Sequence, residues 1–497
     1  MQEQVTGKSH RMLFFNTLAF TVCFAVWVSN GVMITFLVDN DVFNWDSVQI
    51  GWLMGIPILT GSIFRLPMGM LTDKFGGKWV YSALLFFCAV PMFLLSYATT
   101  YWHFVLAGLG YGMAGTGFAI GIANTSVWFP KHWQGRALGI FGVGNAGAAV
   151  TTLLAPKILQ ILTNSGDFTE NWRMLPKLYA LVLVVMGILF VLFTENKKHA
   201  IQNRTTRQLL QPLKNIRVWR FGLYYFLVFG CFVAFSQWLM PYFVNVYGAS
   251  LVIAGLLTSL FSLPSGVIRA LGGWMSDKWG ARQVMVWVFV LSMLCSFFLS
   301  VPRMEIYSPG KGIMAARSGI VREVSDTHIR VDVKHYKILS KSGLNQNYDE
   351  NFLIFPTKDQ WQEPVVKVGD VVKKKQLLAK GVTRIYFQAN LWIFAFLVLF
   401  IGIVWGIGKA GVYRFIPDYF PNEVGVVGGM VGVIGGLGGF ICPILFGYLL
   451  KWTGLWTSCW MLMLVLSVAC HLWMRSTVKK LTKEAAPEIA GDFDRKS

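Results

Sequence analysis

Long runs of apolar residues are the feature that most limits how this 497-residue chain can fold. Several of them reach roughly 18 residues or more, the length that a helix needs to cross the hydrocarbon core of a bilayer. Only 14% of the residues are charged and the mean hydropathy is +0.53, whereas a soluble protein of this size carries more charge. The chain is therefore predicted to be a polytopic protein that has the lipid bilayer as its surroundings.

The apolar pattern predicts twelve spans, and the charges between them predict the orientation. Lysine and arginine concentrate in alternate loops, whereas the loop after the first span carries only the acidic charges Asp39, Asp41 and Asp46. The positive-inside rule therefore places both termini in the cytoplasm, with the chain in the inner (cytoplasmic) membrane. These loops also explain the net charge of +20, so no nucleic-acid partner is expected. The predicted spans are 12–36, 48–71, 79–99, 101–128, 137–160, 176–194, 221–246, 250–275, 284–301, 386–408, 424–450 and 455–474.

Two pairs of similar segments reveal an internal repeat with an insertion. GSIFRLPMGMLTDKFGGK aligns with SGVIRALGGWMSDKWGAR at an offset of 204 residues, which places Arg65 on Arg269. FPKHWQGRALGIFG aligns with IPDYFPNEVGVVGG at an offset of 287, so about 83 residues are inserted in the second half. The polar residues 302–385 match that length. Parallel halves of six spans resemble the architecture of major facilitator transporters.

The predicted fold class is thus an all-α membrane protein with a twelve-helix major facilitator fold and a small β-rich extracytoplasmic insert. Its expected parts follow from the repeat and from the loops. They are an N-terminal half (1–195), a cytoplasmic linker (196–220), spans 7–9 (221–301), the insert (302–385), spans 10–12 (386–476) and a cytoplasmic tail (477–497).

Arg65 and Arg269 place permanent charges inside apolar runs, where an arginine costs at least about 2.5–3.5 kcal/mol. Both have small residues at positions i−4, i−3 and i+4, so we expect both to face neighbouring helices rather than lipid. The predicted spans contain no aspartate or glutamate to neutralise them. The simplest partner is an anionic substrate that both halves hold. The alternative is that both arginines are structural and donate to backbone carbonyls.

Spans 5 and 11 open with the glycine-rich stretches GIFGVGNAGAAV and GVVGGMVGVIGGLGGF. Glycines three or four residues apart let helices approach closely and slide, so they are either packing motifs or walls of a substrate path. Asn145 is a polar side chain at depth among them, and we expect it to line the site or to bond a neighbouring helix. The candidate path glycines are Gly142, Gly144, Gly147, Gly432, Gly435 and Gly436.

Together these motifs resemble those of the nitrate/nitrite porters of the major facilitator superfamily. The resemblance rests on the span-2 and span-8 arginines, on GVGNAG in span 5 and on GMVGVIGGLGG in span 11, and it covers about 410 residues in both halves. The phrases DKFGGK and DKWGAR alone indicate only the superfamily. The resemblance implies a carrier that transports nitrate and nitrite by alternating access and clamps the planar anion between Arg65 and Arg269.

The same resemblance implies an aromatic sandwich around the anion, contributed by spans 4 and 7. The matching residues are Phe118, Tyr225 and Phe229. Tyr225 would offer its hydroxyl to an anion oxygen, and the two phenylalanines would limit the cavity to a flat ion. Without the resemblance, these three residues would be interpreted as core packing.

The expected coupling depends on which groups can carry a proton. A proton symporter usually has a carboxylate or a histidine within the membrane, and none occurs at mid-depth in the predicted spans. Two fixed cations also oppose the return of an empty carrier. We therefore expect exchange of nitrate for nitrite, with proton-coupled nitrate symport and transport of another small anion as alternatives. Lys409, at the end of span 10, is interpreted as a lysine that snorkels to the interface, or alternatively as a third charge on the anion path.

A charged motif recurs at the cytoplasmic ends of spans 2 and 8. Its members are interpreted as gate pairs or helix-end charges and not as substrate ligands. They are Asp73, Lys74, Asp277, Lys278 and Arg282.

The insert contains alternating V-x-V stretches and a VGD turn, which predict short strands. Its last phrase, VVKVGDVVKKKQLLAKG, resembles the closing hairpin of a biotinyl/lipoyl-type domain but lacks the acceptor-lysine triplets, so no covalent cofactor is expected. The insert either docks a protein partner or is a neutral addition, and an anion sensor or receptor is the non-transport alternative. No nucleophile–base pair or metal-ligand set occurs at depth, so neither an enzyme nor a metal site is expected.

Overall fold

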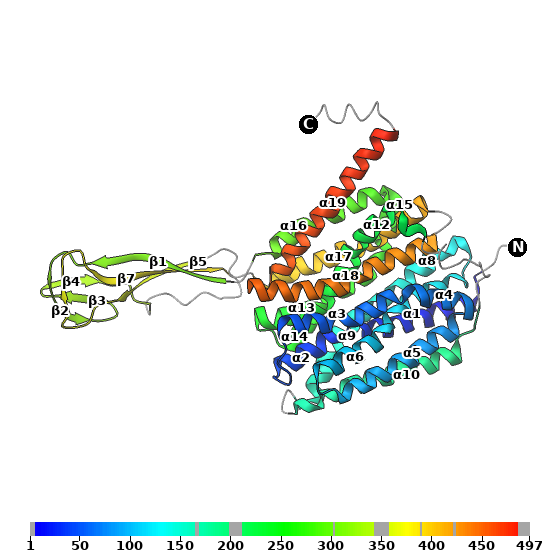
Figure 1. The fold of residues 1–497 in the computed structure, drawn as a ribbon, viewed down its shortest axis with the longest axis horizontal. Coiled ribbons are helices and arrows are strands. Elements are labelled where there is room, and N and C mark those ends of the chain that lie inside the picture. The colour runs from blue at the N-terminus through cyan, green and yellow to red at the C-terminus, as the bar shows by residue number, and fades with distance from the viewer. Residues whose placement is uncertain are drawn as a thin grey trace. The chain divides into compact units, whose positions relative to one another are not determined.

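Most helices of a computed structural model begin and end within a few residues of the predicted spans, but those that match spans 10 and 12 continue to Tyr419 and Ala485, past the predicted ends at 408 and 474 (Figure 1). The structure describes residues 5–164, 168–197, 211–301, 304–341, 357–387, 390–420 and 424–485, so most of the predicted linker and the end of the tail lie outside it. Within these ranges, eleven helical segments are long and apolar enough to cross a membrane, and the pair α14–α15, bent by 46°, makes a twelfth. The predicted helical fold with a small β region is confirmed.

The N-terminal half contains ten helices of the described chain, several of which are joined end to end within one span (Figure 1). They are α1 (Gly7–Trp27), α2 (Asn30–Asp39), α3 (Ser47–Ile63), α4 (Arg65–Phe75), α5 (Gly77–Leu94), α6 (Tyr101–Tyr111), α7 (Gly117–Ser126), α8 (Lys131–Gly142), α9 (Gly147–Leu162) and α10 (Met174–Phe193).

The C-terminal half repeats this arrangement with fewer interruptions, because its last three spans are single long helices. The helices are α12 (Ile216–Tyr225), α13 (Cys231–Tyr247), α14 (Leu251–Val267), α15 (Arg269–Trp279), α16 (Ala281–Leu299), α17 (Leu391–Tyr419), α18 (Val424–Thr453) and α19 (Ser458–Ala485). Short turns η2 (Gly112–Thr116), η3 (Val143–Ala146) and η7 (Phe226–Gly230) interrupt spans 4, 5 and 7.

Each of the two repeated arginines is the first residue after a break in its span. The break between α3 and α4 precedes Arg65, and the break between α14 and α15 precedes Arg269. Pro67 has no N–H for the carbonyl of Ile63, which accounts for the first break. The second half has leucine at the equivalent position and still bends there, so proline is not the common cause. The second break bends the α14–α15 pair by 46°, whereas α3 and α4 together form one continuous span.

The two halves pack closely at the end of the bundle where α3 begins and α18 ends, which we call the Asp46 end; α3 and α18 lie side by side in Figure 1. A Cβ built on Gly51 of α3 would lie 2.4 Å from the Pro443 carbonyl oxygen. One built on Gly255 of α14 would lie 2.2 Å from the Thr152 carbonyl oxygen of α9. Only glycine allows backbones to approach this closely, so the two halves are sealed together at this end.

Asp46 joins the halves and caps α3. Its Oδ1 accepts from the Gln49 N–H at 2.8 Å, and its Oδ2 lies 3.2 Å from the Nζ of Lys451 at the end of α18. The Gln49 N–H, followed by the Lys451 ammonium, holds the pKa of the Asp46 carboxyl below its usual range. A lowered pKa means that the cap and the ion pair stabilise the fold at neutral pH and are lost as the pH falls through that pKa.

We expect Asp46→Ala to lower the free energy of unfolding by about 1 kcal/mol, because an aspartate at this position caps a helix. Asp46→Asn keeps a capping oxygen and loses only the half-exposed ion pair, so its loss should be smaller. Thermal unfolding of the purified protein in detergent measures both. Equal losses in the two variants would show that the cap contributes nothing.

A second compact unit spans Val301–Phe394 and consists of two antiparallel sheets. One sheet has the order β1-β7-β5 and the other the order β4-β3-β2-β6. An apolar core that includes Val321, Ile329, Val372 and Leu378 lies within this unit. The strands are β1 (Met304–Met314), β2 (Gly319–Val324), β3 (His328–Val331), β4 (Lys334–Lys337), β5 (Thr357–Pro364), β6 (Val371–Val372) and β7 (Leu377–Phe387).

Candidate functional site

Arg65 lies at the boundary between the two halves and is only 3% exposed. Its Nη1 donates to the carbonyl oxygen of Gly432 in α18 at 2.8 Å, and its Nε donates to that of Gly115 at 3.4 Å. These two bonds match the alternative in which Arg65 has a structural role and donates to backbone carbonyls. Its Nη2, however, has no hydrogen-bond partner among the described residues. One edge of the guanidinium is thus held by the protein, and the other can donate to an anion.

Aromatic rings surround this guanidinium and link it to the second arginine. The Arg65 Cζ lies 5.2 Å from the ring centroid of Trp27, 5.3 Å from that of Phe118 and 5.2 Å from that of Phe229. The Cζ of Arg269 lies 5.8 Å from the same Phe118 ring. The structure therefore brings the two repeated arginines to one aromatic side chain, and these contacts offset part of the cost of burying Arg65, whereas Arg269 is partly exposed.

The rings of Phe118 and Phe229 are nearly parallel, with an angle of 25° between them and centroids 6.4 Å apart. Both side chains are buried. A planar ion stacked between two rings makes one van der Waals contact with each ring, so the two rings need to lie about 7–8 Å apart. The sandwich that the resemblance implies therefore requires these rings to separate by about 1 Å.

Tyr225 is fully buried and stacks on Phe229, with ring centroids 4.9 Å apart and 8° between the planes. Its hydroxyl makes no well-aligned hydrogen bond in the part of the chain that the structure describes, although the side chains of Tyr413 and Arg269 lie close enough to interact with it. The guanidinium group of Arg65 also lies within electrostatic range of it. A buried hydroxyl without a well-aligned partner beside two cations is suited to donate to an anion oxygen.

Asn145 is fully buried in η3, but the amide atom that it leaves without a partner is the oxygen and not the N–H donor that an anion needs. Its Nδ2 donates to the carbonyl oxygen of Gly142 at 2.8 Å, and its Oδ1 has no partner among the described residues. An anion oxygen requires a donor, so Asn145 can bind one only after its amide turns over. In the orientation seen here it is able to accept from a neighbouring helix.

Three of the six candidate path glycines lie beside an arginine. A Cβ built on Gly142 would lie 3.5 Å from the Cδ of Arg269. Cβ atoms built on Gly432 and Gly436 would lie 3.9 and 3.3 Å from the Nη1 of Arg65. The absence of side chains at Gly142 and Gly432 leaves room beside the two guanidinium groups, whereas a Cβ on Gly436 would also lie 2.4 Å from the Ser62 Oγ.

The other three glycines make tight packing contacts. A Cβ on Gly144 would lie 2.3 Å from the Phe20 ring, and one on Gly147 would lie 2.2 Å from the carbonyl oxygen of Thr21. A Cβ on Gly435 would lie 2.3 Å from Cδ1 of the Tyr225 ring. Gly435 therefore bears on the site indirectly, by allowing the Tyr225 ring to lie against α18.

The small residues on the helix faces around both arginines pack against neighbouring helices at only some of the expected positions. Gly61 lies against the Trp27 indole, and Gly266 lies against the backbone of Ala146. Cβ atoms built on Gly69 and Gly273, at i+4, would meet nothing within 4 Å. The expectation of close helix contact is wrong for these two positions, which lie past the breaks that precede α4 and α15.

The interpretation of Lys409 as a lysine that snorkels to the interface is wrong, because its side chain is 0% exposed. Span 10 was predicted to end at residue 408, whereas α17 continues to Tyr419 and carries Lys409 into the bundle. The Lys409 Nζ donates to the Ser265 Oγ at 2.9 Å and lies 3.1 Å from the ring centroid of Phe232. Arg269 is its charged neighbour.

Tyr413 is a site residue that sequence reasoning missed. The Arg269 Cζ lies 5.4 Å from its ring centroid, and its ring meets that of Tyr225 edge-on at 4.9 Å. Its hydroxyl donates to the Gly428 carbonyl oxygen at 3.1 Å. Tyr413 follows Lys409 by four residues, so a longer predicted span would have placed both on one helix face.

The repeated charged motif lies at the far end from Asp46. Asp73, Lys74, Lys278 and Arg282 are exposed there. The Oδ1 of Asp277 accepts from the Arg414 Nε at 2.8 Å, which links α15 to α17 within one half. A gate role for these residues remains a proposal.

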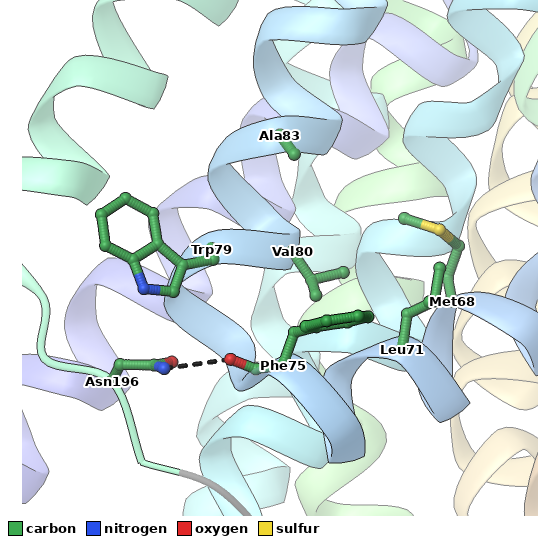
Figure 2. Close-up of a pocket in the computed structure, with 7 residues that line it drawn as sticks. All are labelled: Met68, Leu71, Phe75, Trp79, Val80, Ala83 and Asn196. Atoms are coloured by element: carbon green, nitrogen blue, oxygen red, sulfur yellow. Dashed lines mark hydrogen bonds between the residues drawn. The ribbon is translucent and has the colours of Figure 1, made fainter.

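A separate pocket of about 510 Å³ lies between α4 and α5 (Figure 2). Figure 2 shows it lined by apolar side chains and by Asn196, whose Nδ2 donates to the Phe75 carbonyl oxygen at 3.0 Å. Arg65 and Arg269 are not among its lining residues.

Comparison with known proteins identifies the family. The Major Facilitator Superfamily matches residues 15–310 and 377–495. The chain is 37% identical over 491 residues, 98% of its length and 95% of the relative's, to the probable nitrate/nitrite antiporter NarK1 of Thermus thermophilus. This chain belongs to the nitrate/nitrite porter family of the major facilitator superfamily. It is also 30% identical to the nitrite extrusion protein of Bacillus subtilis, over 63% of this chain and 77% of that one.

Solved structures agree on the fold. A bacterial homologue of the lysosomal transporter Spinster, in an inward-facing and occupied conformation, matches with a TM-score of 0.63 and 12% identity, covering 96% of this chain and 98% of that one. The nucleoside transporter NupG matches with a TM-score of 0.58 and 12% identity, covering 94% of this chain and 99% of that one. These two structures show the fold alone, whereas membership of the family makes the chain a multi-pass membrane transporter and not an enzyme.

Proposed function

We propose that this porter exchanges nitrate for nitrite across the inner membrane by alternating access. The observation that carries the proposal is a pair of buried donors without a well-aligned partner, the Arg65 Nη2 and the Tyr225 hydroxyl, of which the second lies beside Arg269. Both donate, so together they suit an acceptor-only ligand. The names of the relatives from Thermus thermophilus and Bacillus subtilis supply the identity of that ligand.

The clamp acts from both halves. Arg65 belongs to the N-terminal half and Arg269 to the C-terminal half, while Phe118 and Phe229 limit the space between them to a flat ion. A monovalent anion offsets the repulsion between the two cations, so the loaded carrier turns over more easily than the empty one. Obligatory exchange follows from that difference.

We propose that the seal at the Asp46 end closes the carrier on its extracytoplasmic side. The positive-inside pattern assigns that end to the extracytoplasmic side and both termini to the cytoplasm. In this state α3 and α18 close the site to the outside, and the site residues Arg65 and Tyr225 are buried. Opening requires the glycine contacts of Gly51 and Gly255 to separate.

Counterflow in proteoliposomes tests the exchange. Vesicles loaded with nitrite are expected to take up labelled nitrate without a pH gradient, because each nitrite that leaves returns a loaded carrier. Vesicles loaded with neither anion are the control. Binding of nitrate without any flux would support a sensor instead, and absence of uptake until a proton gradient is imposed would contradict exchange.

A further inference from the structure

The pocket between α4 and α5 is polar at one end and apolar along the rest of its length (Figure 2). Its polar end lies near the turn that joins the two helices, where the Asn196 Nδ2 donates to the Phe75 carbonyl oxygen at 3.0 Å. From there the lining continues to Met68 on α4 and to Ala83 on α5. Met68 and Phe75 are about two helical turns apart, so the pocket extends roughly 10 Å along the spans. A cavity of this form suits an amphipathic ligand.

The apolar walls of the pocket are open to the surface of the bundle. The side chains of Leu71, Phe75 and Trp79 are 40%, 47% and 55% exposed. Both helices belong to candidate membrane spans, Ser47–Phe75 and Gly77–Tyr97, so the surface that they expose at depth meets the hydrocarbon of the bilayer. Tryptophan is enriched where a span leaves the membrane, and Trp79 lies near the start of α5. The open side of the pocket is therefore accessible to a lipid acyl chain.

Two ammonium groups lie at the polar end. The Lys74 Nζ is 5.3 Å from the centroid of the Phe75 ring, and the Lys78 Nζ is 5.4 Å from that of the Trp79 ring. Both rings line the pocket, so both lysines lie beside its polar end. Basic pockets between membrane helices on the cytoplasmic side bind anionic lipid headgroups.

The carboxylates nearby leave this end positive. Asp73 is the one carboxylate of the described helices α4 and α5, against the two lysines. Glu195, which precedes Asn196 in the chain, is paired with Arg11 at 2.7 Å and with Lys8 at 3.2 Å. The polar end therefore attracts an anion, and the positive-inside pattern assigns it to the cytoplasmic leaflet.

We propose that this pocket is a binding site for one anionic phospholipid of the cytoplasmic leaflet. The lipid phosphate contacts the ammonium groups of Lys74 and Lys78, and one acyl chain lies along the apolar walls towards Met68 and Ala83. The headgroup uses the charge at the polar end, and the chain uses the apolar length and the open side. A soluble phosphate would use the lysines alone. The site is separate from the anion site, because neither Arg65 nor Arg269 lines it.

Native mass spectrometry of the purified, delipidated protein tests the headgroup contact. The probes are phosphatidylglycerol and phosphatidylcholine with the same palmitoyl and oleoyl chains. The wild type is expected to retain one phosphatidylglycerol more tightly than phosphatidylcholine. Lys74→Gln and Lys78→Gln should each weaken phosphatidylglycerol binding about fivefold, because each removes one cation beside an anionic headgroup. Lys74→Arg and Lys78→Arg keep the charge and should retain the lipid.

Ala83→Phe tests the acyl-chain part of the site without changing a charge. The added ring would occupy the apolar end of the pocket, so phosphatidylglycerol retention should fall although both lysines remain. Glycerol 3-phosphate is the matching soluble probe, because it carries the phosphate and no acyl chain. It should not displace the lipid at equal concentration.

The internal repeat provides the matched control. Lys278 and Arg282 align with Lys74 and Lys78, and the Lys278 Nζ also lies beside a tryptophan, 5.0 Å from the Trp274 ring centroid. None of these second-half residues lines the pocket. Lys278→Gln and Arg282→Gln should therefore retain phosphatidylglycerol as the wild type does.

The outcomes decide the site without any measurement of transport, so its failure would leave the exchange proposal intact. Undiminished phosphatidylglycerol binding in folded Lys74→Gln and Lys78→Gln variants, or equal retention of phosphatidylcholine by the wild type, would overturn the anionic lipid site. Displacement by glycerol 3-phosphate, or undiminished binding in Ala83→Phe, would overturn it in favour of a soluble anion. Thermal unfolding identifies any variant that fails to fold, and the remaining variants then decide.

Discussion

Arg65→Lys and Arg269→Lys are each expected to reduce nitrate/nitrite exchange by about 10- to 100-fold, the loss that follows when a hydrogen bond to a charged group is removed. Arg65 uses Nη1 and Nε to hold the Gly432 and Gly115 carbonyls, which leaves Nη2 for the anion. A lysine has one nitrogen and cannot serve the backbone and the anion in the same geometry. Initial rates of counterflow measure the effect.

Arg11→Lys is the matched control, because Arg11 is an exposed arginine that pairs with Glu195 away from the site. It should keep near wild-type exchange. Thermal unfolding of each variant shows whether a loss of flux comes from the site or from the fold. Near-normal exchange in a folded Arg65→Lys or Arg269→Lys variant would contradict the clamp.

Gly435→Ala should produce a loss of similar size without touching a charged residue. The added methyl group would lie 2.3 Å from Cδ1 of the Tyr225 ring and 3.0 Å from its Cβ, so the ring has to move. Overpacking of this kind costs about 1–3 kcal/mol and here displaces the hydroxyl that is proposed to bind the anion. The expected result is a fall in nitrate affinity of about tenfold or more, measured by equilibrium binding.

Gly429→Ala controls for the change of residue on the same helix. A Cβ at this position would meet only the Leu66 Cδ1, at 4.0 Å. The variant should bind nitrate within about twofold of the wild type, as expected for a substitution that makes only ordinary contacts. Equal losses in Gly429→Ala and Gly435→Ala would mean that a methyl group at either glycine of α18 weakens binding. The role proposed for Tyr225 would then lose its support.

The helical architecture could be predicted from the sequence because apolar length and loop charge are local properties. The spans and the β region follow from runs that can be read along the chain. The repeat that pairs Arg65 with Arg269 also requires only alignment of the chain with itself. The structure adds the breaks before both arginines, of which only the first has a local cause, Pro67.

The neighbours of the site could not be predicted in the same way. The predicted span 10 ends at residue 408, which leaves Lys409 and Tyr413 outside the bundle although α17 continues past both. Trp27 gave no signal, because its contact with Arg65 depends on how two spans pack. The direction of the Asn145 amide likewise depends on a local bond to Gly142 that no spacing reveals.

A structure of the nitrate-bound protein tests the central claim most directly. The expected result is density for one planar anion within hydrogen-bond distance of the Arg65 Nη2 and the Tyr225 hydroxyl, with Arg269 completing the site and the Phe118 and Phe229 rings about 1 Å further apart than 6.4 Å. Density for nitrate at another position, with both arginines unoccupied at a concentration that saturates transport, would contradict the clamp.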